Sequence, residues 1–232
     1  MILGIMQPYF FPYIGYWQMF KAVDKYLIYD DVNYIKGGWI NRNRILIDGK
    51  AHYINLPTIH ASPNKLICDI DLSGELSKRE KILSTIKMSY SRAPFFDDTI
   101  SLLHEIVLFE ESNLAKFLEH SIRSICNHLS INTDILVSSA LAKDNTLRGT
   151  ERLLNICEIL HADTYYNAIG GQSLYDKSEF NARGLALRFL KTHDICYKQF
   201  KNEFIPNLSI IDVLMFNSRD DVIGMLDLFS LI

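Results

Sequence analysis

The first residues that could bind a ligand or take part in a reaction lie in a loop near the start of the chain, where an apolar run is followed by polar and aromatic side chains. Residues 2–6 are continuously apolar, and the sequence continues Gln7-Pro8-Tyr9-Phe10-Phe11-Pro12-Tyr13-Ile14-Gly15-Tyr16. A loop that leaves a buried strand and opens a helix is where α/β proteins bind ligands, because the amide groups of the first helical turn are free. We therefore expect Gln7, Tyr9 and Tyr13 to bind substrate, while Gly15 lets another group approach closely.

The segment Tyr13-Ile14-Gly15-Tyr16 within this loop has the spacing of a nucleotide-binding motif. It resembles the His-x-Gly-His signature of nucleotidylyltransferases and class I aminoacyl-tRNA synthetases, in which the imidazoles donate to phosphate oxygens. Tyrosine replaces both histidines here, and a phenol donates only one neutral hydrogen bond. An aromatic plug over the sheet is the alternative interpretation of the loop.

Two carboxylates close the next apolar run, residues 25–30. Asp30 and Asp31 are placed so that a βαβ unit would bring them beside the first loop. A carboxylate that is partly desolvated beside aromatic rings has a raised pKa, which suits a general base near neutral pH. We therefore expect Asp30 or Asp31 to be catalytic.

Four polar residues follow shortly afterwards: Asn41, Arg42, Asn43 and Arg44. On a strand the two arginines share one face and the two asparagines share the other. We expect these residues to bind substrate, because two arginines on one face can hold a phosphate or carboxylate by paired hydrogen bonds. The alternative is a solvated strand face whose arginines pair with Asp30 or Asp31.

Weaker signals occur later in the chain. Gly170 and Gly171 follow a predicted strand and are expected to form a second substrate-binding loop, although a double glycine is more often a plain turn. Ser209 and Asp212 have the spacing of a helix cap, and we expect both to serve as caps. The seven histidines show no HxxxH or HxH pairing, so no metal site is expected.

The elements that must position these residues alternate between strand and helix. Residues 2–6 and 25–30 are predicted to be buried parallel strands joined by a helix over 13–23. Asp48-Gly49 predicts a hairpin turn between strands at 39–47 and 52–56. Further strands are predicted at residues 66–72, 134–138, 164–167, 185–190 and 195–200. Helices are predicted at residues 77–90, where Ser77 and Glu80 form a capping box, after Pro94, from Asn113, at residues 150–160 and at residues 209–216. The sequence thus predicts one α/β domain over residues 1–232, with a Rossmann-like, mostly parallel sheet and an inserted β-hairpin and helical segment at about residues 37–130.

Composition and charge restrict the class of protein. The 232 residues are 48% apolar and 22% charged, with a formal net charge of −3. This mixture supports a sizeable core and excludes a disordered or coiled-coil chain. The absence of a basic excess argues against DNA as a partner. Residues 1–20 contain prolines and lack a basic leader, and the four cysteines are widely spaced, so we expect no membrane span and a cytoplasmic location.

The chain resembles the WbqC-like protein family over nearly its whole length. The residues that carry the resemblance are Met6–Tyr16, Tyr29–Val32, Trp39–Ile45, Ser89-Tyr90 with Ala93–Phe96, Gly170-Gly171 with Leu174-Tyr175, and Phe204 with Pro206 and Leu208–Asp212. Members of this family occur in bacterial gene clusters for O-antigen and other surface polysaccharides. The resemblance implies a role in polysaccharide biosynthesis, where family members have been suggested to transfer glycine to sugars. It implies no particular catalytic residue.

Three functions are compatible with these observations. The first is an aminoacyl transferase, with glycine as the expected amino acid, that acts on an amino group of a nucleotide-linked or lipid-linked sugar. Its cofactor would be ATP or an already activated amino-acid donor, such as a charged tRNA or a thioester. The second is a nucleotidylyltransferase-like or other sugar-nucleotide enzyme, and the third is a non-catalytic binding protein of the same pathway. The two enzymes predict a tight nucleotide site around residues 7–16, 30–31 and 41–44. The binding protein predicts that these polar groups pair internally and leave no open cleft.

Overall fold

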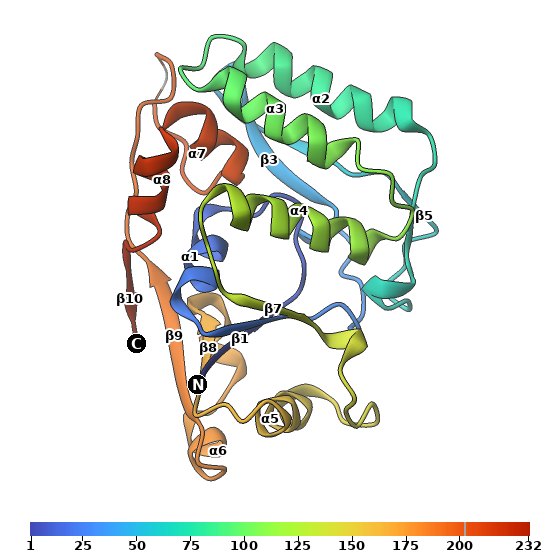
Figure 1. Ribbon diagram of the computed structural model, residues 1–232, viewed down its shortest axis with the longest axis vertical. Coiled ribbons are helices and arrows are strands. Elements are labelled where there is room, and N and C mark those ends of the chain that lie inside the picture. Colours follow the sequence, from blue (N-terminus) through green and yellow to red (C-terminus); the bar gives the residue numbers. More distant parts are fainter. Residues whose placement is uncertain (202) are drawn as a thin grey trace.

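A six-stranded sheet forms the centre of the computed structural model, which describes residues 1–201 and 203–232. The strand order is β10-β9-β8-β1-β2-β7 (Figure 1). Five strands are parallel, namely β1 (Ile2–Met6), β2 (Lys25–Ile28), β7 (Asp134–Val137), β8 (Thr164–Ala168) and β9 (Ala186–Thr192). The last strand, β10 (Phe229–Leu231), runs antiparallel to β9. The α/β class and the mostly parallel, Rossmann-like sheet are thereby confirmed.

The chain reverses its direction across the sheet at β1. It proceeds from β1 to β2 and β7 on one side, then returns to place β8 on the other side of β1. Such a reversal leaves a crevice outside the carboxyl ends of the two strands concerned, and open α/β sheets bind their ligands there. The topology therefore directs attention to the loops that follow β1 and β8.

Helices cover both faces of this sheet (Figure 1). The helices α1 (Ile14–Ala22) and α4 (Leu114–His128) contribute to one hydrophobic core, while α5 (Gly149–Ile159) and α6 (Lys177–Asn181) contribute to the other. Leu3 and Ile5 of β1 belong to the second core, and both are almost fully buried. Because side chains on both faces of β1 are covered, its sequence is continuously apolar.

The predicted hairpin is confirmed between β2 and β7 in the chain. It pairs β3 (Arg42–Ile47) with β4 (Lys50–Asn55) in antiparallel register. Asp48 and Gly49 form its turn with φ values of 48° and 73°, as a two-residue turn that matches strand twist requires. The chain continues through the short pair β5 (Thr58–Ile59) and β6 (Asp71–Leu72) into α2 (Leu76–Tyr90), α3 (Phe96–Val107) and α4.

Three local predictions are wrong. Residues 66–72 contain a helical turn at Ile67–Asp69, because Ile67 and Ile70 both face the core with 0% exposure, three positions apart. Helix α2 begins after Glu75 without a side-chain cap, and Ser77 lies inside it. Residues 195–200 form a loop closed by Gln199, whose amide bonds both the N–H and the carbonyl of Ile205.

The predicted cap at residues 209–212 is half correct. Ser209 caps α7 (Ile210–Phe216) by accepting a hydrogen bond from the Ile211 amide at 3.2 Å. Asp212 is instead a fully buried carboxylate that accepts from the hydroxyls of Tyr90 and Tyr197, both at 2.7 Å, and from Gln199 at 2.6 Å. Asp212 therefore joins α2, α7 and the loop before α7 rather than capping a helix. The helices α6 and α8 (Arg219–Met225) and the strand β10 were not predicted from the sequence.

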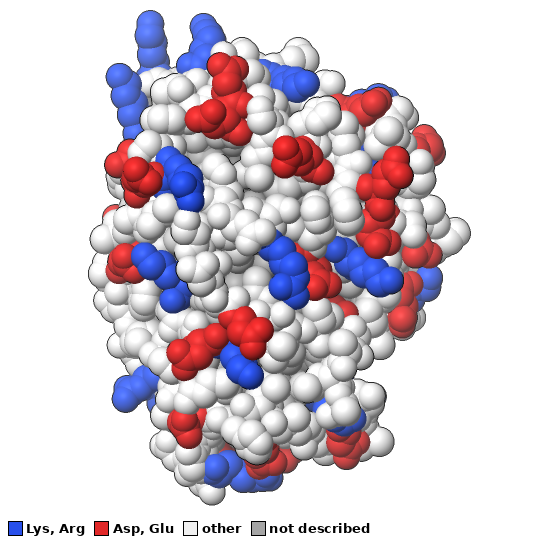
Figure 2. Space-filling view, viewed as in Figure 1, with Lys and Arg blue, Asp and Glu red and all other residues white. Residues whose placement is uncertain are grey.

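Charges are mixed on the face drawn in Figure 2. Acidic and basic side chains alternate over most of this face, and a few basic side chains gather at its upper left edge. Within the described residues, no helix is both long and apolar enough to cross a membrane.

Candidate functional site

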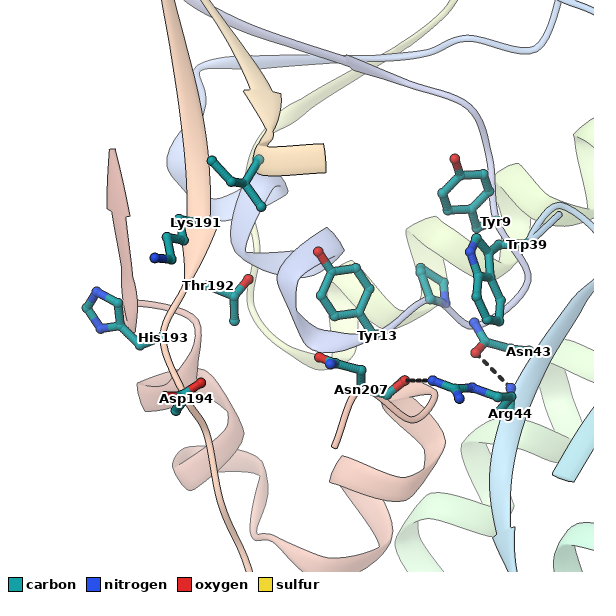
Figure 3. A pocket seen from close by; sticks show the side chains of 12 residues that line it. Tyr9, Tyr13, Trp39, Asn43, Arg44, Lys191, Thr192, His193, Asp194 and Asn207 are labelled. Carbon is teal, nitrogen blue, oxygen red and sulfur yellow. Dashed lines mark hydrogen bonds between the residues drawn. The ribbon is translucent and has the colours of Figure 1, made fainter. Parts of the chain in front are cut away.

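A cavity of about 450 Å³ lies beside the reversal point of the sheet. We call it the switch-point cavity. Its walls come from the loop after β1, the start of β3, the residue after β8 and the end of β9. It is lined by Tyr9, Pro12, Tyr13, Trp39, Asn43, Arg44, Ile169, Lys191, Thr192, His193, Asp194 and Asn207 (Figure 3).

Gly15 allows the floor of this cavity to form. A Cβ atom at this position would lie 2.4 Å from Thr192 Oγ1 and 2.5 Å from Tyr13 Cε2. Figure 3 shows the Thr192 and Tyr13 side chains directed toward one another. The close approach expected at Gly15 is therefore made by two side chains of the protein itself, which places their hydroxyls at the cavity.

The tyrosines of the first loop are neutral hydrogen-bond donors at physiological pH. Burial raises the pKa of Tyr13 above its usual value of 10.0, and a hydrogen bond with Thr192 offsets part of the effect. Burial also raises the pKa of Tyr9, with a smaller contribution from Tyr13. Such hydroxyls can donate to a carbonyl or phosphate oxygen without bringing charge into the cavity.

Asn43 fixes the backbone of the loop after β1. Its Nδ2 atom donates to the carbonyl oxygens of Phe10 at 3.0 Å and Phe11 at 2.9 Å. The Phe11 carbonyl also accepts from Ser209 Oγ at 2.7 Å. Phe11 has a φ of 44°, a conformation that is strained for a bulky residue and persists only where its surroundings enforce it. Asn43 and Ser209 supply that constraint beside the cavity.

Arg44 presents an available cation to the cavity. One terminal nitrogen donates to the Asn207 carbonyl at 3.3 Å, and the buried Nε has no partner among the described residues. The guanidinium lies 5.6 Å from the centre of the Trp39 ring. An arginine that makes so few hydrogen bonds within the protein can bind a phosphate or carboxylate by charged hydrogen bonds.

Asn41 and Arg42 are engaged elsewhere. Asn41 accepts from the Tyr34 hydroxyl at 2.7 Å and donates to the Leu56 carbonyl at 3.0 Å. Arg42 donates to the carbonyls of Gly37 and Gly38 and lies 4.4 Å from the centre of the Tyr53 ring. Neither residue lines the switch-point cavity.

Sequence reasoning missed the contribution of β9. Lys191, Thr192, His193 and Asp194 line the cavity from the end of this strand. His193 Nε2 lies 2.6 Å from Ser230 Oγ, and Figure 3 shows the Lys191 and His193 side chains directed away from Tyr13. The available signal was their position directly after a predicted strand at residues 185–190, since carboxyl ends of parallel strands meet at one edge of a sheet. Trp39 and Asn207 also line the cavity without having been named as ligand residues.

Asp31 faces a different cavity. This second cavity, of about 510 Å³, lies at the carboxyl ends of β2 and β7 and is lined by Tyr29, Asp31, Val32, Asn33, Leu66, Cys68, Ser139, Asn145, Arg148, Gly149 and Arg152. Asp31 Oδ2 contacts Lys143 Nζ at 2.5 Å and an Arg152 nitrogen at 2.7 Å. All three side chains are at least nine-tenths buried.

The two carboxylates differ in their electrostatics. Burial favours a higher pKa for Asp31, but hydrogen bonds from Lys143 and Ser138 and the charge of Arg152 outweigh it, so the pKa is lowered. Burial raises the pKa of Asp30, although its oxygens accept from the Ser139 amide at 2.8 Å and the Ser139 hydroxyl at 2.6 Å. Two cations therefore keep Asp31 ionised, and both carboxylate oxygens of Asp30 accept hydrogen bonds from Ser139.

Three further expected residues, Gln7, Gly170 and Gly171, do not line the switch-point cavity. Gln7 follows β1, and its Oε1 atom is buried without a partner among the described residues. Gly170 and Gly171 belong to the helical turn Ile169–Leu174, whose first residue lines the cavity. A Cβ on Gly171 would lie 3.0 Å from Asn167 Oδ1, whereas one on Gly170 would meet nothing within 4 Å. The structure thus brings Tyr9, Tyr13, Asn43 and Arg44 together and places Asp31 in another cavity.

Comparisons with known proteins match most of the chain. The sequence model of the WbqC-like protein family matches residues 7–223. A curated relative, the uncharacterized protein Rv1507c of Mycobacterium tuberculosis, is 29% identical over 224 residues, which cover 93% of each chain. No solved structure matches the chain significantly.

Proposed function

The chain belongs to the WbqC-like protein family, and from this premise we propose that it is a transferase that adds an aminoacyl group, glycyl above all, to the amine of a nucleotide-linked or lipid-linked sugar during O-antigen or other surface-polysaccharide biosynthesis. The switch-point cavity carries the proposal. Its volume of about 450 Å³ falls in the range of small-molecule sites. Its lining combines the aromatic rings of Tyr9, Tyr13 and Trp39 with polar and charged side chains, which can fix the orientation of a polar ligand.

The cavity offers separate groups for the two parts of a sugar phosphate. Trp39 and Tyr9 present ring faces against which the apolar face of a sugar can pack, and both lie on the same side of the cavity in Figure 3. Arg44, close to Trp39, supplies a charge for a phosphate oxygen. An amino sugar attached to a phosphate or pyrophosphate matches this arrangement.

The reaction needs a base and a donor to the carbonyl oxygen. In the transfer, the sugar nitrogen attacks the activated carbonyl carbon, an amide bond forms, and the bond to the leaving group breaks with its electron pair. The attacking amine must lose protons to a base, and we assign this role to Asp194, which is one of the residues lining the cavity. The hydroxyls of Tyr13 and Thr192 are placed to donate to the carbonyl oxygen as negative charge develops there.

This assignment differs from the expectation drawn from the sequence, in which Asp30 or Asp31 is the general base. Asp31 lines the second cavity and is neutralised by Lys143 and Arg152. Asp30 accepts two hydrogen bonds from Ser139. Neither carboxylate lines the switch-point cavity, in which the proposed reaction takes place.

The carboxyl group of the amino acid can be activated by two routes. Either ATP adenylylates the amino acid in the first loop, or the donor arrives already activated as a thioester or charged tRNA. Because tyrosines replace both histidines of the nucleotidyl-transfer signature, the second route is favoured. Glycine-dependent exchange of labelled pyrophosphate into ATP would identify the first route.

Mass spectrometry of an amino-sugar nucleotide incubated with purified protein tests the proposal. With a glycyl thioester, or with glycine and ATP, the sugar should gain one glycyl group. The Asp194→Asn variant should lose this activity while the exposed control Asp220→Asn retains it. If no glycyl donor yields product and the nucleotide sugar alone is consumed, the protein is instead another enzyme of sugar-nucleotide metabolism.

A further inference from the structure

Three exposed apolar side chains lie together next to the switch-point cavity. They are Ile35, Trp39 and Tyr53, with exposed fractions of 51%, 39% and 49%. The ring centres of Trp39 and Tyr53 are 6.2 Å apart. Ile35 Cγ2 lies 3.1 Å from the position of a Cβ on Gly38, the residue before Trp39. Single exposed apolar residues are ordinary, but three together beside a cavity indicate an interaction surface.

Three basic side chains accompany these apolar groups. The Arg42 guanidinium lies 4.4 Å from the centre of the Tyr53 ring. The Arg44 guanidinium lies 5.6 Å from the centre of the Trp39 ring. Lys36 is exposed in the loop before Trp39. None of the three cations forms an ion pair within the part of the chain that the structure describes. We call the whole set the hairpin patch: Ile35, Lys36, Trp39, Arg42, Arg44 and Tyr53.

The segment that carries the hairpin patch is poor in carboxylates. Residues 32–68 contain a single acidic residue, Asp48, and five basic ones: Lys36, Arg42, Arg44, Lys50 and Lys65. Asp48 lies in the hairpin turn, at the other end of β3 from Arg42. Asp194 lines the same cavity as Trp39, but Figure 3 shows it on the opposite side. The complement of this basic and aromatic patch is therefore an anionic surface.

The residue types of the patch favour a phospholipid bilayer as that surface. Trp and Tyr rings lie at the level of the lipid headgroups, and neighbouring Lys and Arg side chains meet the lipid phosphates. RNA would also engage rings and cations, but a bilayer in addition offers an apolar environment to the exposed Ile35. A second copy of the chain would set like charges against one another.

We propose that the hairpin patch docks the protein on an anionic membrane surface. Its apolar side chains enter the interfacial layer, and its basic side chains face the lipid phosphates. Because Trp39 also lines the switch-point cavity, docking sets this cavity against the headgroups. A sugar joined to a membrane lipid then lies within reach, so docking serves the lipid-linked acceptor. This choice of acceptor rests on the proposed function, whereas docking itself does not.

Tryptophan fluorescence of the full chain tests docking at the patch. The chain has two tryptophans, and Trp17 is 0% exposed, so a change on addition of vesicles reports Trp39. Vesicles that contain phosphatidylglycerol should shift the Trp39 emission to shorter wavelength, whereas phosphatidylcholine alone should not. Lipids brominated in their acyl chains should quench the emission, and added salt should reverse the effect.

A double variant outside the cavity lining measures the contribution of the patch. Ile35→Ser with Lys36→Gln removes one apolar and one basic side chain and should weaken vesicle co-sedimentation at least tenfold. One basic residue at an anionic surface alone contributes about fivefold. Met88→Ser with Lys87→Gln is the matched control on α2, because Met88 is 83% exposed and Lys87 is also exposed. The control should bind vesicles like the unmodified chain, and melting temperatures report whether both variants are folded.

Docking is refuted if phosphatidylglycerol vesicles do not bind, if neutral vesicles bind equally, or if both double variants lose binding equally. Sedimentation equilibrium without lipid and titration with tRNA examine the other partners. A dimer or an RNA complex that only the Ile35→Ser, Lys36→Gln variant abolishes would assign the patch to that partner and overturn the proposal.

The same variants separate docking from the proposed function. Both double variants should transfer glycine to a soluble amino-sugar nucleotide at the rate of the unmodified chain. Absence of docking with this transfer intact would refute docking alone. Docking without transfer to any acceptor would refute the proposed function alone.

Discussion

Replacement of Gly15 by alanine tests how the floor of the switch-point cavity is built. The added methyl group would lie 2.4 Å from Thr192 Oγ1 and 2.5 Å from Tyr13 Cε2. Both side chains must therefore move, and overpacking of this kind costs about 1–3 kcal/mol. Because alanine otherwise stabilises a helix by roughly 0.5–1 kcal/mol relative to glycine, we expect a net loss of up to about 2.5 kcal/mol in the free energy of unfolding.

Gly224 provides a matched control in another helix. A Cβ on Gly224 in α8 meets nothing within 4 Å, so Gly224→Ala should gain roughly 0.5–1 kcal/mol. Equilibrium unfolding in urea measures both variants. The reasoning fails if Gly15→Ala is stabilised as much as Gly224→Ala.

A second substitution identifies the cause of the loss at Gly15. Thr192→Ala removes the oxygen nearest to the added methyl group, so the double variant should recover part of the lost stability. Gly15→Ala should also bind an amino-sugar nucleotide more weakly, because the displaced Tyr13 and Thr192 line the cavity. Strict additivity of the two substitutions would contradict the proposed contact.

Three further predictions follow from the site and its surroundings. Arg44→Ala should weaken phosphate-bearing ligands by ~1.5–3 kcal/mol in calorimetry, whereas Arg42→Ala, whose guanidinium bonds Gly37 and Gly38, should not. Asp31→Ala leaves Lys143 and Arg152 buried without their counter-ion and should lose about 3–5 kcal/mol of stability in urea, against a change within about 0.5 kcal/mol for exposed Asp69→Ala. Burial raises the pKa of Asp212, so the folded state binds its proton more readily than the unfolded state, and this contribution to stability falls as the pH rises from 3.8 through the raised value. Asp212→Asn should lose that dependence in urea unfolding at several pH values, and an unchanged slope would show that Asp212 is not its source.

The parts of the fold that could be predicted from the sequence are those in which the type of a residue indicates its own burial or backbone conformation. Residues 2–6 are continuously apolar because β1 is covered on both faces, and the prediction of adjacent parallel strands is confirmed. Asp48 and Gly49 both adopt positive φ, which their residue types tolerate, so the hairpin was also predictable. Residues 66–72 alternate in the sequence like a strand, but burial of Ile67 and Ile70 on one side selects a helical turn instead.

The composition of the site was harder to predict because it depends on the order of strands. Asp31 follows β2 on one side of β1, whereas β8 and β9 lie on the other side. No local pattern states this order, so carboxylates close to the first loop in sequence were expected in the same cleft. For the same reason Asp194, distant in the chain, was not expected to share a cavity with Tyr13. Contact across a sheet is a tertiary property, and local spacing does not encode it.

The most direct test of the account is a crystal structure of the protein with a nucleotide-linked amino sugar. The account predicts the sugar against Trp39 and Tyr9, a phosphate oxygen within hydrogen-bonding distance of Arg44, and the amine facing Asp194. A sugar bound only in the second cavity, or an amine remote from Asp194 with Arg44 unoccupied, would contradict it.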